Sequence, residues 1–448
     1  MNTPICDFVK QYKENAPLRL HMPGHKGVDG AFSESLDITE VEGADSLYSA
    51  DGIIRESEEN ASRLFGCKTY YSTEGSSQCI RAMLSLLSLY CRATEKKARI
   101  LAARNVHKTF LGAAALLDIE VDLFPQEDAS SYLSAHISPS SLNAYLRTID
   151  ERPSALYVTS PDYLGTLSDI EGLAQVCHRY GLLLLVDNAH GAYLKFLPTS
   201  QHPMDLGADL SCDSAHKTLP VLTGGAYLHL SPALPRFFEA HAKEALSLFG
   251  STSPSYLILQ SLDAANVLLE EKFPQSLERF LSHAARLWHR LRHAGYTLSS
   301  DEPLKLTIHA KRYGYTGTEI SSHLRKNGIE CEFADPDFVV LMFSPFFEET
   351  ELAHLTRVLC ELEKRDANPA SAPSLVPARR VLSLRDAILS PSEEIPVEKA
   401  LGRILSAPSV SCPPAVPILF PGEVINENAI DAFLYYGIEA CRVVSVKE

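Results

Sequence analysis

The chain has 448 residues, of which 45% are hydrophobic and 22% are charged, a balance typical of globular enzymes and unlike that of disordered chains. Its formal net charge of -15 argues against a protein that binds nucleic acid or anionic membrane surfaces, because both are negatively charged. No stretch reaches the ~18 apolar residues of a membrane span, and the N-terminus lacks the apolar core of a secretory signal. We therefore expect a cytoplasmic protein with no nucleic-acid or membrane partner.

Residues 1–52 are rich in turn-forming residues and predict an extended N-terminal arm. The segment HMPGHKG, residues 21–27, places two histidines four positions apart. Pro23 and Gly24 between them break any helix that would bring both imidazoles onto one metal ion. The ten cysteines include no C-x-x-C pair. We expect no metal site.

A helix is predicted from about Ile53, followed by a short strand over residues 68–73. A turn with Gly75, Ser76 and Ser77 then opens a helix whose apolar residues repeat at helical spacing. Backbone N–H groups, two hydroxyls and the positive end of a helix dipole meet at this turn, which favours phosphate binding. An ordinary serine N-cap explains the same residues equally well.

From residue 99 onward, strand patterns alternate with helical patterns, which predicts a mostly parallel, doubly wound sheet. The strands are predicted over residues 99–103, 119–124, 155–159 and 182–186. In such sheets ligands bind beyond the carboxyl ends of the strands. We therefore expect one site from the polar residues that follow the strands: Asn105, His107, Ser160, Asp162, Asp187, His190, Ser214, His216 and Lys217.

Lys217 follows a short strand in the segment DLSCDSAHKTLPVLTGGAYL, residues 209–228. A lysine that acts as an amine nucleophile needs a rigid position and a partly dry pocket. A lone lysine is more commonly a solvated surface residue. The predicted convergence of the strand ends on Lys217 favours the catalytic interpretation.

The chain is predicted to continue with smaller domains after a large domain at residues 53–270. Residues 271–365 predict a small α+β domain that begins with an amphipathic helix. Residues 366–448 predict a Pro/Ala/Ser-rich linker followed by a C-terminal domain.

The predicted site suits pyridoxal 5'-phosphate (PLP). Its aldehyde condenses with a lysine amine, its ring nitrogen stays protonated beside a desolvated carboxylate, its ring needs a flat partner, and its phosphate needs an anion site. Lys217 offers the amine, Asp187 the carboxylate and His107 the flat partner for the ring. The turn at Gly75 offers the anion site.

Segments along nearly the whole chain resemble the Orn/Lys/Arg decarboxylase family, PLP enzymes of the aspartate aminotransferase fold. In family order they are HMPGHKG, GSSQCIRAM, RNVHKTF, DNAHGAYL, SAHKTLPVLTGGAYLHL, STSPSYLILQSLDAA and PPAVPILFPGE. The chain resembles the short members, which lack an N-terminal wing domain. The resemblance implies an α/β fold, with a PLP-dependent transferase-like large domain built on a mostly parallel sheet and smaller α+β C-terminal domains.

The resemblance also implies roles at the cofactor. It implies that Lys217 binds the aldehyde, that Asp187 pairs with the ring nitrogen and that His107 stacks on the ring. His216 matches a position beside the phosphate and the lysine. The remaining matched residues contact the phosphate or line the ring: Gly75, Ser76, Ser77, Ala189, His190 and Ser214.

Two further features of the resemblance concern the phosphate. Thr252, in the segment STSP, resembles a residue that reaches the phosphate of a partner subunit, which implies a homodimer with the active site at the subunit interface. Glu74 departs from the family pattern and adds a negative charge beside the predicted anion site.

The resemblance implies decarboxylation of arginine, lysine or ornithine, with arginine as first choice, to an amine and CO2 in polyamine-type metabolism. A distal cation calls for a carboxylate, and residues 330–338 offer Glu332, Asp335 and Asp337. Glu332 is the predicted substrate-binding group, and a solvated acidic loop is the equal alternative.

Two other functions stay open. One is an aminotransferase or aldolase on the same fold, since a fold does not define a reaction; no arginine is assignable to the carboxylate of a keto acid. The other is a catalytically silent homologue that regulates a decarboxylase, against which the intact Lys217 and Asp187 argue.

Overall fold

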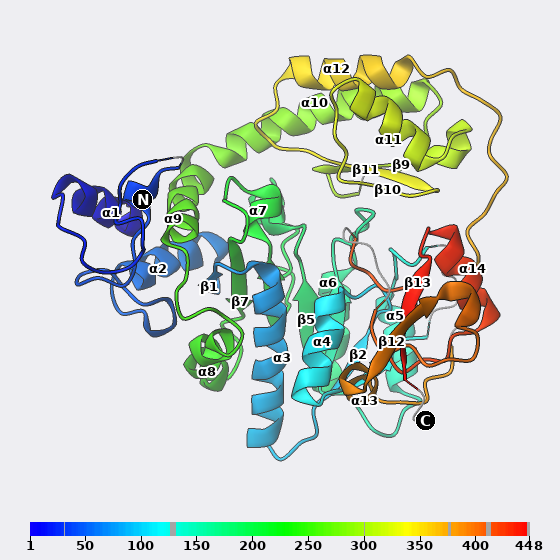
Figure 1. The fold of residues 1–448 in the computed structure, drawn as a ribbon, viewed down its shortest axis with the longest axis horizontal. Helices are drawn as coiled ribbons and strands as arrows, with labels where there is room; N and C mark the ends of the chain where they lie inside the picture. The colour runs from blue at the N-terminus through cyan, green and yellow to red at the C-terminus, as the bar shows by residue number, and fades with distance from the viewer. Residues whose placement is uncertain (31, 126–130, 300, 375–377, 409–413, 446–448) are drawn as a thin grey trace. The chain divides into compact units, whose positions relative to one another are not determined.

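A computed structural model describes residues 1–30, 32–125, 131–299, 301–374, 378–408 and 414–445 (Figure 1). Within these residues the strands form sheets of seven, four and two members. The chain divides into two compact units, one made of residues 1–98 and 170–276 and the other of residues 99–169 and 277–448. The predicted boundaries of the arm and the three domains stay predictions.

The largest sheet has the strand order β1-β7-β6-β5-β4-β2-β3. β5 pairs with β6, and β2 with β3 and β4, in parallel, whereas β7 pairs antiparallel with β1 and β6. The predicted α/β class with a mostly parallel sheet is confirmed. The strands are β1 (Lys68–Ser72), β2 (Arg99–Ala102), β3 (Glu120–Leu123), β4 (Ala155–Thr159), β5 (Leu183–Asp187), β6 (Leu210–Asp213) and β7 (Ala226–Leu230).

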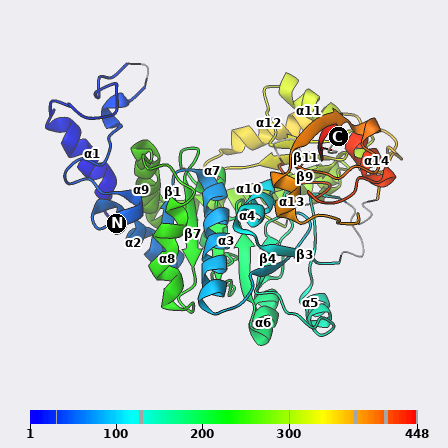
Figure 2. The ribbon, with the colours of Figure 1, turned by 60° about the horizontal axis from the view of Figure 1, so that its bottom comes forward.

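In the first unit, α3 packs against β6, β7 and α8 (Figure 2). The stripe of Ile80, Met83, Leu84 and Leu87 on α3 is buried, as its helical spacing predicts. The helices of this unit are α1 (Pro4–Glu14), α2 (Ile53–Phe65), α3 (Gly75–Ala93), α6 (Ile170–Tyr180), α7 (Ala215–Thr218), α8 (Arg236–Ser247) and α9 (Tyr256–Glu271), with short 3-10 turns at Glu34–Leu36, Leu47–Ser49 and Ala192–Phe196.

The prediction of an extended arm missed α1. Ile5 and Val9, one helical turn apart, are fully buried. The carboxylate oxygen Oδ2 of Asp263 in α9 accepts hydrogen bonds from the backbone N–H groups of Ile5 and Cys6, at 3.0 and 2.9 Å. These N–H groups have no partner within their own helix, so a residue distant in sequence stabilises its first turn.

The second unit holds the four-stranded sheet, in the order β10-β11-β9-β8. Thr316 and Glu319 form a capping box at the start of α11. The elements of this unit up to residue 360 are α4 (Lys108–Leu117), α5 (Pro139–Leu146), β8 (Leu298–Ser299), β9 (Lys305–His309), a 3-10 turn (Ala310–Tyr313), α11 (Gly317–Lys326), β10 (Phe333–Ala334), β11 (Phe338–Met342) and α12 (Glu349–Cys360); α10 (Phe273–His293) begins at the end of the first unit.

The C-terminal segment packs into one apolar cluster that includes Leu133, Tyr163 and Phe333. Arg104 donates to both carboxylate oxygens of the buried Glu423, at 2.8 and 3.1 Å. The elements of the segment are α13 (Leu384–Leu389), β12 (Ser392–Pro396), a 3-10 turn (Val397–Lys399), α14 (Glu427–Tyr435) and β13 (Ala440–Val444). Residues 375–377 of the predicted linker, and residues 409–413, which include the first proline of the PPAVPILFPGE motif, lie outside the described residues.

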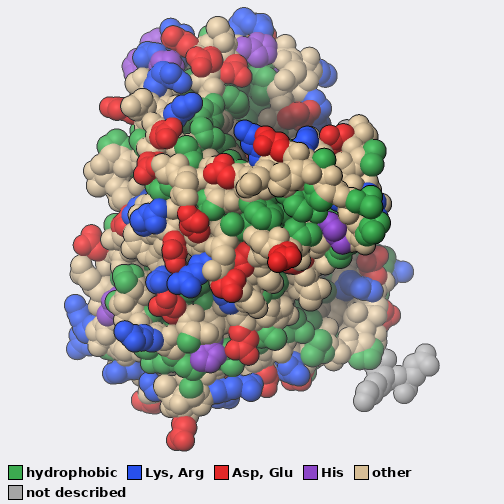
Figure 3. Space-filling view, turned by 90° about the vertical axis from the view of Figure 1, so that its left-hand side faces the viewer, with side chains coloured by type: hydrophobic (Ala, Val, Ile, Leu, Met, Phe, Trp, Pro, Cys, Tyr) green, Lys and Arg blue, Asp and Glu red, His purple; other side chains and the backbone are tan. Residues whose placement is uncertain are grey.

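Acidic and basic side chains are interspersed over the face drawn in Figure 3. None of the helices among the described residues combines the length and the apolar character that a membrane span requires.

Candidate active site

Lys217 lies on α7, the short helix that follows β6, and its side chain is exposed. Its Nζ lies 2.9 Å from Nε2 of His190, in the turn that follows β5. The amine is therefore reachable from solvent while an imidazole nitrogen lies within hydrogen-bond distance of it. This exposure differs from the partly dry pocket expected for a nucleophilic lysine, whereas the imidazole is a hydrogen-bond partner that can orient the amine.

His216, the residue before Lys217, has a defined tautomer. Its Nδ1 lies 3.0 Å from the carbonyl oxygen of Gly225, which only accepts, so Nδ1 carries the proton. Burial lowers the pKa of His216, and the charge of Lys217 lowers it further. We conclude that the imidazole is neutral near pH 7, with Nε2 as an acceptor.

The predicted phosphate turn lies against the Lys217 segment. Ser214 Oγ donates to Ser76 Oγ at 2.7 Å, and the N–H of Gly75 donates to the carbonyl of Gly224 at 2.7 Å. Gly75 has φ +72°, and a Cβ on Gly224 would lie 2.8 Å from the carbonyl oxygen of Thr73, so both positions favour glycine. Ser76 and Ser77 begin the 19-residue α3, whose dipole favours an anion at this point.

Glu74 has a hydrogen-bond partner in the segment before α9. Its Oε1 accepts a hydrogen bond from the N–H of Ser251 at 2.5 Å. Thr252, the next residue, is exposed. The carboxylate that the sequence places beside the anion site therefore anchors the segment that carries Thr252.

Asp187 ends β5 and is 2% exposed. Its Oδ1 accepts from the N–H of Ala189 at 3.2 Å and lies 3.7 Å from the sulfur of Cys212. Burial and the neighbouring Asp187 charge hold the pKa of Cys212 well above its usual range, so its thiol keeps its proton and donates. A buried carboxylate oriented in this way suits a partner for a protonated ring nitrogen.

The reasoning from sequence missed Asn188 and Asp213. Asn188 Nδ2 donates to Asp213 Oδ1 at 2.7 Å, joining the turn after β5 to the end of β6. Asp213 is the last residue of its strand. The rule that polar residues at strand ends converge could have selected it, but the sequence analysis gave no bounds for the strand before Lys217.

The second unit holds the predicted site residues Asn105, His107, Ser160, Asp162 and Glu332. His107 is the N-cap of α4, where its Nδ1 accepts from the N–H of Thr109 at 3.2 Å. Glu332 lies before β10, and its Oε1 accepts from the hydroxyl of Tyr163 at 2.9 Å. That His107 and Glu332 converge on Lys217 stays a prediction.

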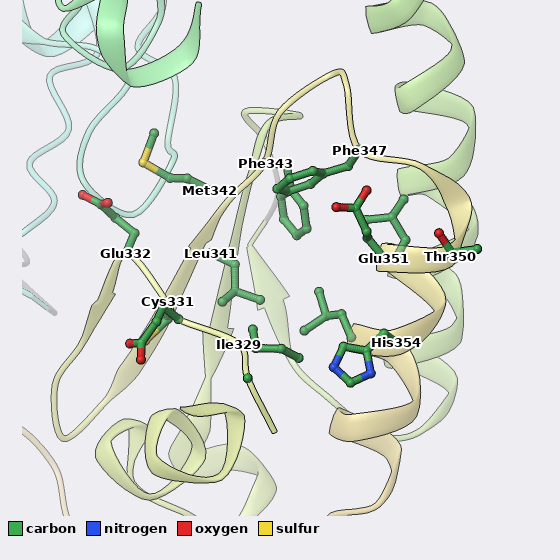
Figure 4. Close-up of a pocket in the computed structure, with 14 residues that line it drawn as sticks. Ile329, Cys331, Glu332, Leu341, Met342, Phe343, Phe347, Thr350, Glu351 and His354 are labelled. Carbon is green, nitrogen blue, oxygen red and sulfur yellow. The ribbon is translucent and has the colours of Figure 1, made fainter. Parts of the chain in front are cut away.

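Glu332 also lines a cavity of about 690 Å³ within the second unit. Figure 4 shows the apolar side chains of Leu341, Phe343 and Phe347 in this cavity, and Glu332 and Met342 pointing away from them. The residues predicted to hold the cofactor do not line it. The cavity therefore adds no support to the predicted cofactor site.

Asp335 and Asp337, the two aspartates of the 330–338 segment, face α14. Asp337 Oδ1 lies 2.8 Å from Lys311 Nζ and accepts from the hydroxyl of Tyr435 at 2.8 Å. Asp335 Oδ1 accepts the N–H groups of Asp337 and Phe338, both at 2.7 Å. Burial, with a smaller contribution from the charge of Asp337, raises the pKa of Asp335 to about 6.

Replacing Asp335 with asparagine should stabilise the protein above pH 6. The raised pKa means that the folded state binds the Asp335 proton more tightly than the unfolded state, so wild-type stability falls as pH rises from about 4 through 6. At about 1.4 kcal/mol per pKa unit, the gain at pH 8 is about 2–3 kcal/mol and vanishes near pH 4. Urea unfolding at both pH values measures it.

Asp337→Asn is the matched control for that experiment, because Asp337 pairs with Lys311 and its loss should destabilise the protein at pH 8. A gain for Asp335→Asn that is equal at pH 4 and pH 8 would contradict the assigned ionisation.

Known proteins are similar to this chain over nearly its whole length. Residues 3–282 match the family model "Orn/Lys/Arg decarboxylase, major domain", and residues 373–441 match "Orn/Lys/Arg decarboxylase, C-terminal domain". The chain is 30% identical to an arginine decarboxylase of Bacillus subtilis, over 98% of this chain and 94% of that protein. It is 29% identical to an arginine decarboxylase of Bacillus anthracis, over 96% and 92%.

A solved structure has the same fold. The lysine decarboxylase of Francisella novicida superposes with a TM-score of 0.80 at 17% identity, covering 99% of this chain and 81% of that one. The matched models, the relatives and the fold agree with the family that the motifs predicted. The chain therefore belongs to the Orn/Lys/Arg decarboxylase family.

Proposed function

We propose that this member of the decarboxylase family binds PLP at Lys217 and decarboxylates arginine. The observation that carries the proposal is the 2.9 Å approach of His190 Nε2 to Lys217 Nζ, in a unit that also holds the buried Asp187 carboxylate. The arginine decarboxylases among the relatives support arginine over lysine or ornithine. When bound, PLP supplies an electron sink for the bond that breaks between Cα and the carboxylate.

The proposed site residues of the first unit have distinct roles. His190 Nε2, 2.9 Å from Lys217 Nζ, is placed to accept a hydrogen bond from the amine and to orient it toward an aldehyde. Asp187, buried and held by two donors, keeps a proton on a ring nitrogen beside it. Gly75, Ser76, Ser77 and Ser214, at the N-terminus of α3, would hold the phosphate, with the neutral His216 close to them.

Further roles rest on the family resemblance. His107 would stack on the ring of PLP, and Ala189 would line its other face. Thr252 contacts the phosphate of a partner subunit, which requires a homodimer; its exposure in the single chain agrees with that role. The cytoplasmic location stays a prediction.

The proposed reaction breaks the Cα–carboxylate bond, releases CO2 and adds a proton to Cα to give an amine. Measuring CO2 and amine from arginine, lysine and ornithine tests it. We expect arginine to give the highest kcat/KM. Formation of a keto acid without CO2 would favour the aminotransferase alternative. A folded, PLP-supplemented protein that binds no cofactor would favour the silent regulatory homologue.

The proposed partner of the distal guanidinium is Glu332. Glu332→Gln keeps an oxygen for the Tyr163 hydroxyl but removes the charge. Hydrogen bonds to charged groups contribute about 1.5–3 kcal/mol, so we expect KM for arginine to rise roughly 10- to 100-fold, with a smaller effect on kcat. Steady-state kinetics measures both.

Glu330→Gln is the control for this substitution, because Glu330 lies two residues away and pairs with Arg325 at 3.1 Å. We expect it to leave KM unchanged. An unchanged preference among the three amino acids in Glu332→Gln would contradict the assignment.

A further inference from the structure

A buried carboxylate lies beneath the proposed site, at the end of β6. Asp213 is fully buried, and its carboxylate accepts hydrogen bonds from three side-chain N–H groups. Asn188 Nδ2 lies 2.7 Å from its Oδ1, and Nε2 of both His202 and His229 lies 3.0 Å from its Oδ2. Burial raises the pKa of a carboxyl, but the two histidines outweigh it and hold the pKa of Asp213 well below its usual range.

The hydrogen bonds of the two imidazoles define where their protons lie. His202 Nδ1 accepts from the backbone N–H of Met204 at 3.3 Å, so its proton lies on Nε2 and points at Asp213. His229 Nδ1 lies 2.9 Å from Thr69 Oγ1, a group that donates or accepts. Nε2 of both imidazoles is therefore the ring nitrogen that faces Asp213, and Nδ1 of each has a hydrogen-bond partner of its own.

The Asp213 cluster, defined as Asp213, His202, His229 and Asn188, touches both segments of the proposed site. Through Asn188 it holds the turn that contains Asp187 and His190. A Cβ on Gly191, which closes this turn, would lie 2.0 Å from Asn188 Oδ1, so the Asn188 side chain fills the space beneath the turn. On the other side, Asp213 directly precedes Ser214 and the helix of Lys217.

We propose that Asp213 is a positioning residue that sets the Asp187 turn against the Lys217 helix, and that its anionic form does so by holding Asn188. This inference rests on the proposed function, because it assigns a purpose to the geometry of that site. One carboxylate accepts all three N–H groups, so its loss leaves buried donors unpaired on elements that carry Asp187, His190 and Lys217.

Three members of the cluster, Asp213, His202 and His229, also form the one group of three or more potential metal ligands among the described residues. A metal ion bound to His202 Nε2 would need the ring proton on Nδ1, where the N–H of Met204 already donates. The hydrogen bonding therefore assigns protons, and not an ion, to the space between the three side chains.

Asp213→Asn and Asp209→Asn make a matched pair for the test. Asp209 precedes β6 at its opposite end, where it accepts from His178 Nε2 at 3.0 Å and from the N–H of Leu184 at 2.7 Å. Both variants thus remove a buried carboxylate bonded to histidine, but only one adjoins the site. Urea unfolding gives the loss in the free energy of unfolding of each variant. The measurements at the site are then compared between the two variants with this loss taken into account.

Two measurements, hydrogen–deuterium exchange and PLP titration, report on the site itself. Hydrogen–deuterium exchange of the protein without PLP reports the turn at residues 187–191, and titration with PLP gives a dissociation constant and the pH at which the visible band changes. We expect Asp213→Asn to speed exchange in this turn and to raise the PLP dissociation constant, each about tenfold, and to shift the pH of the spectral change. Asp209→Asn should leave all three unchanged.

Equal effects of the two variants would overturn the proposal, as would stoichiometric metal in the wild-type protein that Asp213→Asn loses. Asn188→Ala keeps the carboxylate and both histidines, so it tests the link even where Asp213→Asn fails to fold; unchanged exchange and PLP binding in it would overturn the proposal. The exchange result needs neither PLP nor turnover, so failure of the proposed reaction is recognised separately.

Discussion

Replacing Lys217 with alanine is expected to remove decarboxylation almost completely. Loss of the amine removes the only proposed covalent attachment point for the cofactor, and with it the group that lies 2.9 Å from His190 Nε2. Removing the nucleophile of an enzyme costs about three orders of magnitude or more in kcat. Steady-state CO2 release measures the loss, and the visible band of the PLP-loaded protein should disappear with it.

The fold of Lys217→Ala should be retained, because the Lys217 side chain is exposed. Thermal unfolding of the variant should therefore match wild type in the absence of PLP. Lys195→Ala is a suitable control, since Lys195 pairs with Asp205 at 2.7 Å and has no proposed catalytic role. Wild-type turnover in Lys217→Ala would contradict the proposed function.

Asp187→Asn is expected to lower kcat by about two to three orders of magnitude, because an amide cannot enforce protonation of a ring nitrogen as a buried carboxylate does. Asparagine keeps an oxygen for the N–H of Ala189 and the thiol of Cys212. We therefore expect a loss in kcat larger than the loss in PLP affinity. Single-turnover CO2 release, with PLP titration alongside, separates the two.

The control for Asp187→Asn is Asp205→Asn, on a partly exposed carboxylate that pairs with Lys195. It should change neither kcat nor PLP affinity. A variant Asp187→Asn that loses PLP affinity but keeps its kcat when saturated would assign Asp187 to cofactor binding alone.

The elements of the parallel sheet were predictable from sequence because their signals are local. The apolar run before Asp187 predicted β5, and the spacing of Ile80 to Leu87 predicted the buried face of α3. The positions of Asp187 and Lys217 after strands followed from the same patterns. Their shared unit and the approach of His190 to Lys217 agree with the rule for strand ends.

Other features were beyond the sequence because distant residues determine them. Asp263 of α9 accepts hydrogen bonds from the first N–H groups of α1, and no residue near Ile5 in the sequence indicates this distant carboxylate. Asp335 lies in the same acidic segment as Glu332, yet it is buried near Tyr132 and α14. Charge alone did not separate these two acids. Their surroundings in the fold did.

The pairing of β1 with β7 has a consequence for synthesis of the protein. β1 is an edge strand whose neighbour, β7, leaves the ribosome after β2 to β6 have been made. The turn at Gly75 likewise depends on the carbonyl of Gly224, in the loop before β7. β1 and the turn at Gly75 cannot form these contacts until β7 and Gly224 have been synthesised, and such long-range pairing slows folding. Nascent chains that stop before β7 should therefore expose β1 and depend on chaperones.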